Sequence, residues 1–409
     1  MTEGPALDDL ALTAFAPDTP QCVGVAVSGG GDSMAALHLL ARHFTVEAVT
    51  VDHGLRPEAA AEARFVAQGC ARLGVFHSVL HWHRGEARGN LMDQARRARI
   101  RLIGDWARAR GLRHVALGHT ADDQAETFVM RLGRSAGLEG LSGMRRRWEE
   151  NGVIWTRPFL GVGRAALRDW LRAADLGWID DPSNDNDNFD RVKARKALRE
   201  LAPLGISVAR ICETTAHLAA AEDALEECLR HMAGDLVRAD RGDLVIAPAA
   251  FGPALPPELR RRLIVRALQW VGGQGYAPRA DAVAGLLAEL QQGRSATLAG
   301  CRILARTDEI RITREWSAVA GLRVPTGQQW DRWQMEGPGE TGLEIAALGE
   351  DGLRACPQWR ECGLPRPSLM ASPAVWRGEY LIAAPLAGRE NGWKARIVRG
   401  TFLQKPFSH

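Results

Sequence analysis

Strands and helices alternate along residues 23 to 130 of this 409-residue chain, and this order restricts its fold more than any other feature. The expected strands are short apolar runs, and the expected helices carry apolar residues at three- and four-residue spacing. The strands cover 23–27, 46–52, 75–81 and 114–119, and the helices cover 33–43, 58–73, 91–110 and a segment from 122. Because strands that alternate with helices pair in parallel, we predict an α/β fold with a doubly wound parallel sheet.

The pattern changes after residue 205. Apolar residues at three- and four-residue spacing predict helices over 206–234, 257–271 and 278–292. Short apolar segments separated by glycines then predict strands within 297–313, 374–385 and 395–402. We therefore predict three domains: an α/β domain over 1–205, a helical module over 206–293 and a small β-rich C-terminal domain over 294–409.

The amino-acid composition restricts the cellular compartment and the binding partners that we expect. The formal net charge of +3 is too small to indicate a nucleic-acid partner by itself. The seven cysteines are odd in number and include no CxxC pair, which favours free thiols in a reducing compartment. The N-terminus lacks a basic segment followed by an apolar one, and no apolar run reaches membrane-spanning length. We expect a cytoplasmic protein with no membrane association.

The glycine-rich turn SGGGDS follows the first strand and opens the first helix. Such a turn lets backbone amides approach a phosphate, and the helix dipole adds attraction. It lacks the lysine of a Walker loop and the GxGxxG spacing of a dinucleotide site. A plain strand-to-helix turn capped by Ser or Asp is the alternative. The candidate phosphate-binding residues are Ser28, Gly29, Gly30, Gly31, Asp32 and Ser33, with Asp32 a candidate Mg²⁺ ligand.

Polar residues also follow two other predicted strands. Asp52 and His53 end the strand at 46–52, and His119 ends the strand at 114–119. Ligands of doubly wound sheets bind beyond the carboxyl ends of the strands, so these residues are candidates for the same site. The segment GHTADDQAETFVMRL then places Asp123 and Glu126 on one helix face. This pair suits a cation, either a metal or an ammonium group, and helix capping is the alternative.

Two basic segments complete the candidate site. In NLMDQARRARIR, Arg96 and Arg99 lie about one helical turn apart and are candidates for phosphate contacts. The acidic, turn-rich DDPSNDNDN at 180–188 leads into RVKARK, which contains Arg191 and Arg195. We expect that segment to become ordered on binding a nucleotide or an RNA backbone. The arginines of ELRRRLIVRAL at 258–268 are a further candidate surface for RNA.

These motifs carry a family resemblance. SGGGDS after a strand is similar to the pyrophosphate loop, or PP-loop, of the N-type ATP pyrophosphatases. The ordered segments VDHGLRPE, GHTADDQAETFVMRL, GLSGM, RPFL and DDPSN with FDR resemble the tRNA(Ile)-lysidine synthetase family and cover residues 23 to about 198. The resemblance implies an adenine nucleotide alpha hydrolase-like fold for 1–205. It also implies that the helical module binds tRNA and that the β-rich domain helps to recognise it.

The resemblance implies a two-step ligase reaction. ATP adenylates the C2 oxygen of the wobble cytidine in the CAU anticodon of tRNA(Ile), and the amine of free L-lysine then displaces AMP. Mg²⁺ is the implied metal. The implied catalytic residues are Asp32, Asp52, His53, His119, Asp123 and Glu126, of which Asp123 and Glu126 bind lysine, and the implied phosphate or tRNA contacts are Arg96, Arg99, Arg191 and Arg195.

Two alternatives stay open at this point. A PP-loop tRNA thiolase shares the loop and a tRNA partner but needs paired active-site thiols, and the chain has no CxxC pair. A catalytically inactive RNA-binding protein on an enzyme scaffold would not need the intact loop and acidic residues. Dependence of pyrophosphate release on tRNA, and on lysine or a sulfur donor, separates the three. The sequence leaves the oligomeric state open.

Overall fold

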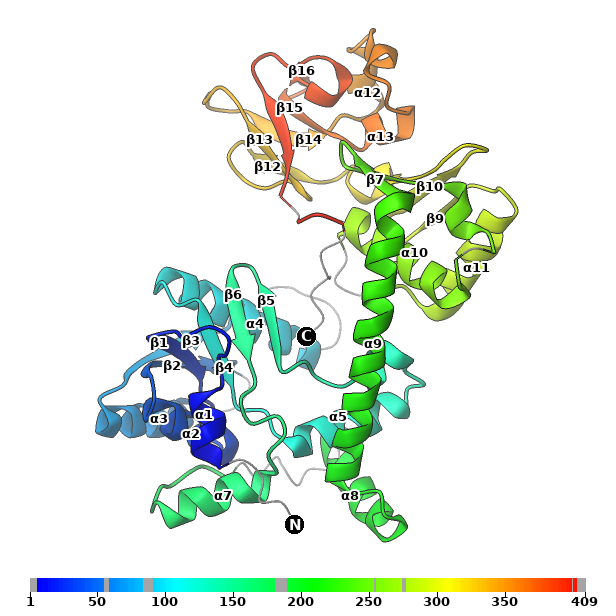
Figure 1. Ribbon diagram of the computed structural model, residues 1–409. Helices are drawn as coiled ribbons and strands as arrows, with labels where there is room; N and C mark the ends of the chain where they lie inside the picture. The colour runs from blue at the N-terminus through cyan, green and yellow to red at the C-terminus, as the bar shows by residue number, and fades with distance from the viewer. Residues whose placement is uncertain are drawn as a thin grey trace. The chain divides into compact units, whose positions relative to one another are not determined.

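The computed structural model describes residues 6–54, 59–83, 91–180, 190–253, 255–273, 277–398 and 400–402. The chain forms two compact units, Met1–Asp223 and Ala224–Ser408, each described here by itself. The division falls inside the longest helix, α9 (Val208–Leu236), which is labelled in Figure 1. The predicted domain boundaries near 205 and 293 stay predictions.

A six-stranded sheet forms the centre of the first unit. Its order is β3-β2-β1-β4-β6-β5, and all neighbours pair in parallel except β5 and β6, which are antiparallel. This sheet confirms the predicted α/β fold. The strands are β1 (Cys22–Ala26), β2 (Thr45–Asp52), β3 (Phe76–His81), β4 (His114–Leu117), β5 (Arg147–Glu150) and β6 (Val153–Thr156).

Helices cover both faces of this sheet, as doubly wound folds require. Val23 and Val25 of β1 pack in one apolar cluster with residues of α1, α2, α3 and α7. Val115 and Leu117 of β4 pack in another cluster with residues of α4, because alternate side chains of a strand point to opposite faces. The helices are α1 (Leu7–Leu12), α2 (Gly31–Ala41), α3 (Ala59–Leu73), α4 (Leu91–Ala109), α5 (Ala121–Leu132), α6 (Leu138–Leu141), α7 (Arg164–Ala173) and α8 (Asp190–Leu201).

The sheet changes direction at β1. The chain passes from β1 to β2 and β3 on one side, and β4 then pairs with the other edge of β1. A ligand site in such a sheet lies beyond the carboxyl ends of the strands at this switch point. β4 ends at Leu117, two residues before the predicted end, so Gly118 and His119 lie in the connection to α5. The segment RVKARK forms part of α8, and residues 181–188 of the preceding acidic stretch lie outside the described residues.

The second unit contains three smaller sheets. A five-stranded antiparallel sheet has the order β7-β8-β11-β10-β9, so strands from both sides of residue 293 pair with each other. A four-stranded sheet has the order β12-β14-β15-β16, and β13 pairs with β17. The strands are β7 (Val237–Asp240), β8 (Asp243–Ile246), β9 (Ala296–Leu298), β10 (Cys301–Ala305), β11 (Ile310–Arg314), β12 (Arg323–Pro325), β13 (Trp333–Glu336), β14 (Glu344–Ala347), β15 (Pro373–Arg377), β16 (Tyr380–Ala383) and β17 (Lys394–Ile397).

Helix α10 (Pro257–Gly272) packs with α11 (Ala280–Gln291) over the five-stranded sheet, and the short helices α12 (Gly349–Arg354) and α13 (Arg366–Met370) follow later. Arg262 and Arg266 of α10 are buried and bond to Glu226 of α9. The prediction that the ELRRRLIVRAL arginines form an RNA surface is therefore wrong for these two. Buried guanidiniums need carboxylate partners, and here the partner is supplied from within the unit.

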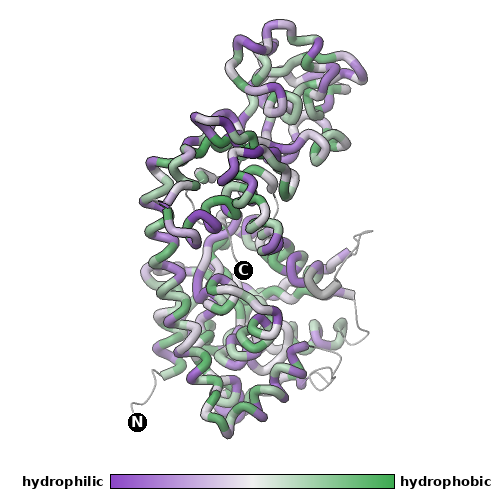
Figure 2. The backbone as a smooth tube through the Cα atoms, turned by 90° about the vertical axis from the view of Figure 1, so that its right-hand side faces the viewer, coloured by the Kyte–Doolittle hydropathy of each residue, from purple (hydrophilic) through white to green (hydrophobic). Residues whose placement is uncertain are grey.

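The spacing of buried residues along α9 explains why this segment forms one long helix. Its buried residues are spaced three, four or seven apart, which gives one continuous stripe. Hydrophilic and hydrophobic residues accordingly alternate along it in Figure 2. The buried residues of the stripe are Ile211, Thr215, Glu222, Glu226, Leu229 and Ala233. Throughout the described residues, no helix combines the length and the apolar character needed to span a membrane.

The closest approach at the switch point involves Gly118. A Cβ added there would lie 2.9 Å from the Cα of Ser33 and 3.0 Å from the carbonyl oxygen of Asp32. Because both neighbours are backbone atoms, we expect Gly118→Ala to lower the free energy of unfolding by about 1–3 kcal/mol. Chemical denaturation measures this change. Gly285→Ala in α11 is the control, because nothing lies within 4 Å of the added Cβ. A Gly118→Ala protein as stable as the parent would contradict the prediction.

Candidate active site

The SGGGDS turn forms a compact loop between β1 and α2. Gly29 has a φ of +91°, a conformation that favours glycine, and Gly30 occupies the N-cap position of α2. The hydroxyl of Ser33 donates to the carbonyl of Gly30 at 2.9 Å, and its oxygen accepts from the backbone N–H of Ser28 at 3.1 Å. Gly31 begins the helix. The loop therefore presents a glycine-lined backbone at a helix N-terminus, the arrangement that binds phosphate.

Three carboxylates meet beside this loop, and we call them the acid cluster: Asp32 of α2, and Asp123 and Glu126 of α5. They meet on the guanidinium of Arg164, the first residue of α7. Arg164 Nε donates to Asp32 Oδ2 at 3.0 Å, Nη2 to Asp123 Oδ1 at 3.2 Å, and Nη1 to Glu126 Oε1 at 3.3 Å. Arg195 Nε also donates to Glu126 Oε1, at 2.6 Å. The structure thus brings together acids that the sequence assigned to two separate motifs.

Asp123 both caps helix α5 and contacts Arg164. Its side chain accepts from the backbone N–H of Thr120 at 2.9 Å, and Thr120 accepts in turn from the N–H of Asp123, which makes a capping box. The capping interpretation is therefore confirmed for Asp123. Its other oxygen accepts from Arg164, so capping uses only one oxygen of the carboxylate.

Two oxygens of the acid cluster are buried without a hydrogen-bond partner among the described residues: Asp32 Oδ1 and Glu126 Oε2. Buried carboxylate oxygens are costly to leave unpaired, which marks both as positions for a ligand. Burial raises the pKa of Asp32, although the guanidinium of Arg164 opposes the shift. Burial opposes the charged form of Arg164, but the acid cluster outweighs it and raises the pKa of Arg164. The pairing keeps Arg164 charged.

His119 lies directly after β4 among arginines. Its Nδ1 accepts a hydrogen bond from Nε of Arg157 at 3.0 Å, which leaves Nε2 as the position for a proton. Burial lowers the pKa of His119 well below its ordinary value, and the charges of Arg157 and Arg99 lower it further. The imidazole is therefore neutral at neutral pH.

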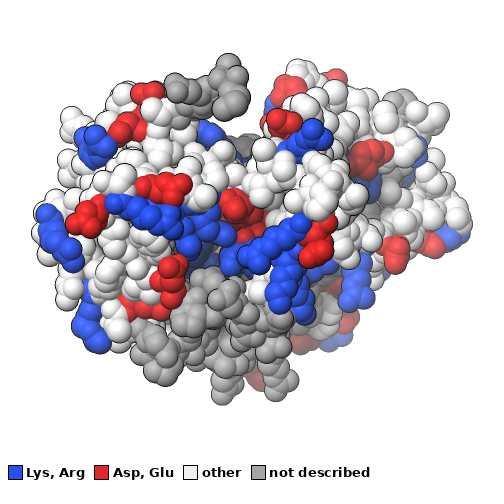
Figure 3. Space-filling view, turned by 90° about the horizontal axis from the view of Figure 1, so that it is seen from below, with Lys and Arg blue, Asp and Glu red and all other residues white. Residues whose placement is uncertain are grey.

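The predicted phosphate-contacting arginines gather in this region. The charges of Arg99, Arg191 and Arg96 all act on His119. Burial, together with Arg191 and Arg96, lowers the pKa of Arg99 to about 10. On the face seen from below, Lys and Arg side chains gather beside Asp and Glu side chains around a hollow in the surface (Figure 3). Clustered guanidiniums repel one another, and an anion would relieve that repulsion.

Asp52 is the last residue of β2, and His53 follows it. Asp52 accepts from the backbone N–H of Gly54 at 2.8 Å and lies 3.6 Å from Nδ1 of His81. The His53 ring packs edge-on against Trp82, and burial followed by the charge of Arg99 lowers its pKa. These contacts place His53 near Arg99 and Asp52 beside His81, and neither residue has a described contact with the Arg164 guanidinium.

Arg164 and Arg168 are functional candidates that the sequence did not identify. They lie one turn apart on α7, and Arg168 Cγ would lie 3.4 Å from a Cβ on Gly31 of the loop. Arg168 Nη2 donates to Asp180 at 2.9 Å, while its Nε is buried without a hydrogen-bond partner among the described residues. The i, i+4 spacing of two arginines was visible in GRAALRDW, but nothing local to it indicated that α7 packs against the loop.

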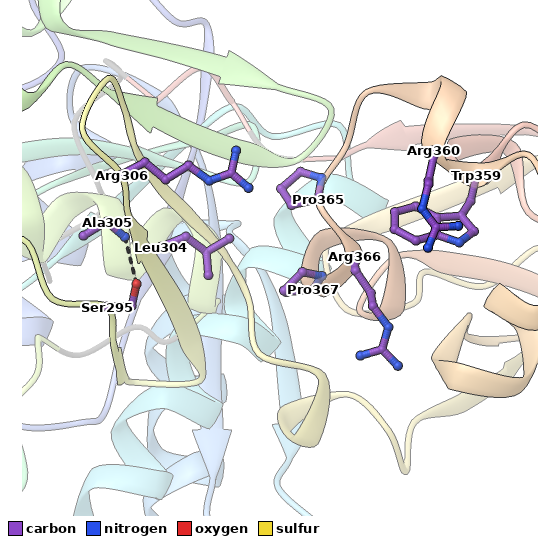
Figure 4. A pocket seen from close by; sticks show the side chains of 9 residues that line it. All are labelled: Ser295, Leu304, Ala305, Arg306, Trp359, Arg360, Pro365, Arg366 and Pro367. Carbon is purple, nitrogen blue, oxygen red and sulfur yellow. Dashed lines mark hydrogen bonds between the residues drawn. The ribbon is translucent and has the colours of Figure 1, made fainter.

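The second unit contains a cavity of about 510 Å³. Arg306 extends into it toward Pro365 in Figure 4, and the guanidinium of Arg360 stacks 4.5 Å from the ring centre of Trp359. The residues around it are Ser295, Leu304, Ala305, Arg306, Trp359, Arg360, Pro365, Arg366 and Pro367. Exposed arginines beside an aromatic ring suit a nucleic-acid strand, because they offer charge for phosphates and a face for base stacking.

A parallel sheet with this loop at its switch point defines a PP-loop nucleotide-binding protein, and residues 7–202 match the PP-loop domain family. The chain is 50% identical to the tRNA(Ile)-lysidine synthase of Ruegeria pomeroyi, across 94% of this chain and 93% of the relative. It is 35% identical to the tRNA(Ile)-lysidine synthase of Wolbachia sp. subsp. Brugia malayi, across 74% and 72%. The chain belongs to the tRNA(Ile)-lysidine synthase family, which confirms the family and the enzyme class expected from the motifs.

A solved structure also resembles the chain. It is the U34-tRNA thiolase of Methanococcus maripaludis with its [4Fe-4S] cluster, similar over 52% of this chain and 78% of its own, at 14% identity and a TM-score of 0.46. This likeness carries no argument for the thiolase alternative.

The neutral state of His119 has a consequence for stability. An unfolded histidine takes up a proton near pH 6.5, whereas folded His119 does so only at much lower pH. Its contribution to stability is thus present above pH 6.5 and is lost as the pH falls. We expect the unfolding free energy of His119→Gln to fall less between pH 7 and pH 5 than that of the parent. Denaturation at both pH values measures it, with the exposed His83→Gln as control. An identical pH dependence in His119→Gln and the parent would contradict the assignment.

Proposed function

We propose that the chain ligates lysine to the C2 of the wobble cytidine in the CAU anticodon of tRNA(Ile), using ATP. The cytidine oxygen is first adenylated with release of pyrophosphate, and the lysine amine then displaces AMP to form lysidine. ATP use and a tRNA substrate follow from the family. The observation that carries the proposal is the convergence of a phosphate-binding loop and an acid cluster on one guanidinium.

In the first step, the glycine loop and Arg168 bind the phosphates of ATP. The α2 N-terminus and the unpaired Arg168 Nε both favour the charge that develops on departing pyrophosphate. The unpartnered Asp32 Oδ1 fits a magnesium ion, which binds through one or two carboxylates and substrate oxygens. A bound magnesium ion would supply charge neutralisation at the phosphates.

In the second step, the acid cluster binds the lysine ammonium. Its carboxylates pair with the guanidiniums of Arg164 and Arg195, and Glu126 Oε2 remains as a buried oxygen for the ammonium group. The lysine nitrogen must lose a proton before it attacks the adenylated carbon. Glu126 Oε2 is a buried oxygen of the acid cluster that can accept this proton, whereas Nδ1 of His119 already accepts from Arg157.

Two surfaces serve the tRNA. The arginines around His119 contact phosphates near the reacting base, and the cavity of the second unit binds another part of the tRNA. The helical module and the β-rich domain thereby give the selectivity that a single base cannot provide. The cytoplasmic location stays a prediction.

Glu126→Gln tests the amine site. It removes one charge but preserves the shape of the side chain. Losing one charge-assisted contact should weaken apparent lysine affinity by about ten- to a hundredfold, or roughly 1.5–3 kcal/mol. Adenylation of tRNA without lysine should persist. Lysine incorporation against lysine concentration, and adenylated tRNA formed in its absence, measure the two steps.

Glu149→Gln is the matched control, because Glu149 is an exposed residue of β5 in the same unit. It should leave both steps unchanged. If both steps decline together in Glu126→Gln, then Glu126 serves the nucleotide, and the amine site lies elsewhere.

The cavity of the second unit yields a separate prediction. Replacing Arg306, Arg360 and Arg366 together by Ala should weaken tRNA binding about ten- to a hundredfold at moderate salt, because phosphate contacts dominate such affinities. The dependence of tRNA affinity on salt should become shallower, while ATP affinity should not change. Filter binding across a salt series measures both quantities.

A triple variant of exposed arginines away from the cavity, Arg323, Arg377 and Arg396, removes the same charge and is the control. Equal losses in the two triple variants would show that the cavity has no specific role and that only net charge matters.

A further inference from the structure

Arg164 occupies the place where a substrate cation is expected. Its guanidinium donates to one oxygen of each member of the acid cluster. The contacts are shielded from water, because the side chains of Arg164, Asp123 and Glu126 are 18%, 10% and 1% exposed. Arg164 belongs to a helix that is remote in sequence from both acidic motifs, so it is a cation of the chain held within the acid cluster.

The oxygens of Asp123 and Glu126 show what remains for a substrate. Thr120 and Arg164 take the two oxygens of Asp123. Arg164 and Arg195 share Glu126 Oε1, which leaves Glu126 Oε2 as the buried oxygen without a hydrogen-bond partner among the described residues. An ammonium group bound here with Arg164 in place would gain one unshared oxygen. With Arg164 withdrawn, it would gain an oxygen of each acid.

The same guanidinium lies beside the phosphate-binding loop. It donates to Asp32, the second residue of α2, and Arg168 one turn further along α7 lies against Gly31. Nucleotide phosphates at the loop would bring several negative charges next to Arg164, and guanidinium binds phosphate oxygens at least as readily as carboxylates. ATP therefore offers Arg164 an alternative partner.

We propose that Arg164 is a positioning residue that occupies the lysine subsite until nucleotide binds. Without nucleotide it competes with the lysine ammonium for the acid cluster. With nucleotide it turns toward the phosphates and frees Asp123 and Glu126. Lysine then binds tightly only to an enzyme that already holds ATP, so nucleotide binding precedes amine binding. The inference rests on the proposed function, because it requires lysine to bind at the acid cluster.

A lysine titration tests the inference. Isothermal titration calorimetry measures lysine affinity with and without a non-hydrolysable ATP analogue and magnesium, for the parent, Arg164→Met and Arg164→Lys. In the parent, the analogue should tighten lysine binding about tenfold or more, since only the fraction of protein with a free subsite binds. Arg164→Met should bind lysine at least as tightly without nucleotide as the parent does with it. The effect of the analogue should then disappear.

Arg164→Lys retains the charge with fewer donors, so it should show an intermediate effect of the analogue. It also tests the inference if Arg164→Met does not fold. A merely structural Arg164 would give weaker lysine binding in both variants, with the effect of the analogue retained, and that result would overturn the inference.

Glu126→Gln separates this inference from the proposed function. If Glu126→Gln binds lysine as the parent does, the amine site itself is wrong. If Glu126→Gln binds lysine more weakly but Arg164→Met does not bind it more tightly, the acid cluster is the amine site and the role proposed for Arg164 is wrong.

Discussion

Charge repulsion within the acid cluster is the constraint around which the first unit is arranged. Asp32, Asp123 and Glu126 lie close enough to share one guanidinium, and carboxylates at such separations raise one another's pKa unless a cation lies among them. Arg164 supplies that cation and is held at the start of α7, where its backbone N–H also donates to Asp122 at 2.6 Å. The charge state of the acid cluster therefore depends on the position of α7, because that helix holds Arg164 in place.

The topology of the sheet delivers these groups to one place. Because β1 and β4 are neighbours, the loop after β1 and the helix after β4 begin side by side, and Gly118 allows their backbones to approach. The two segments bring the proposed phosphate site and the proposed amine site within reach of the Arg164 side chain. A two-step reaction needs this proximity, because the second substrate must attack an atom activated at the first site.

The second unit is stabilised by buried ion pairs of another kind. Arg311 donates to Asp240 and Asp243, and Ser368 donates to Asp243 at 2.6 Å. These bonds connect the five-stranded sheet with α13. These bonds hold elements of the unit together, whereas in the acid cluster Asp32 Oδ1 and Glu126 Oε2 are buried without a hydrogen-bond partner among the described residues.

The sequence by itself determined the local features of this protein. Apolar periodicity predicted the strands β1–β4 and the helices α2–α5 to within a few residues, and three glycines after a strand predicted the loop, because both depend on neighbours a few positions apart. The strands β5 and β6 and the helices α1 and α6–α8 were not predicted. Asp123 and Glu126 were identified from their helical spacing, and capping was confirmed for Asp123. Tertiary structure decided the rest. Arg164 meets Asp32 across 132 positions, and Arg262 and Arg266 are buried by Glu226, although nothing near them distinguishes them from exposed arginines. The partner of a charged side chain is set by which elements pack together, and local spacing carries no information on contacts made over such distances in the chain.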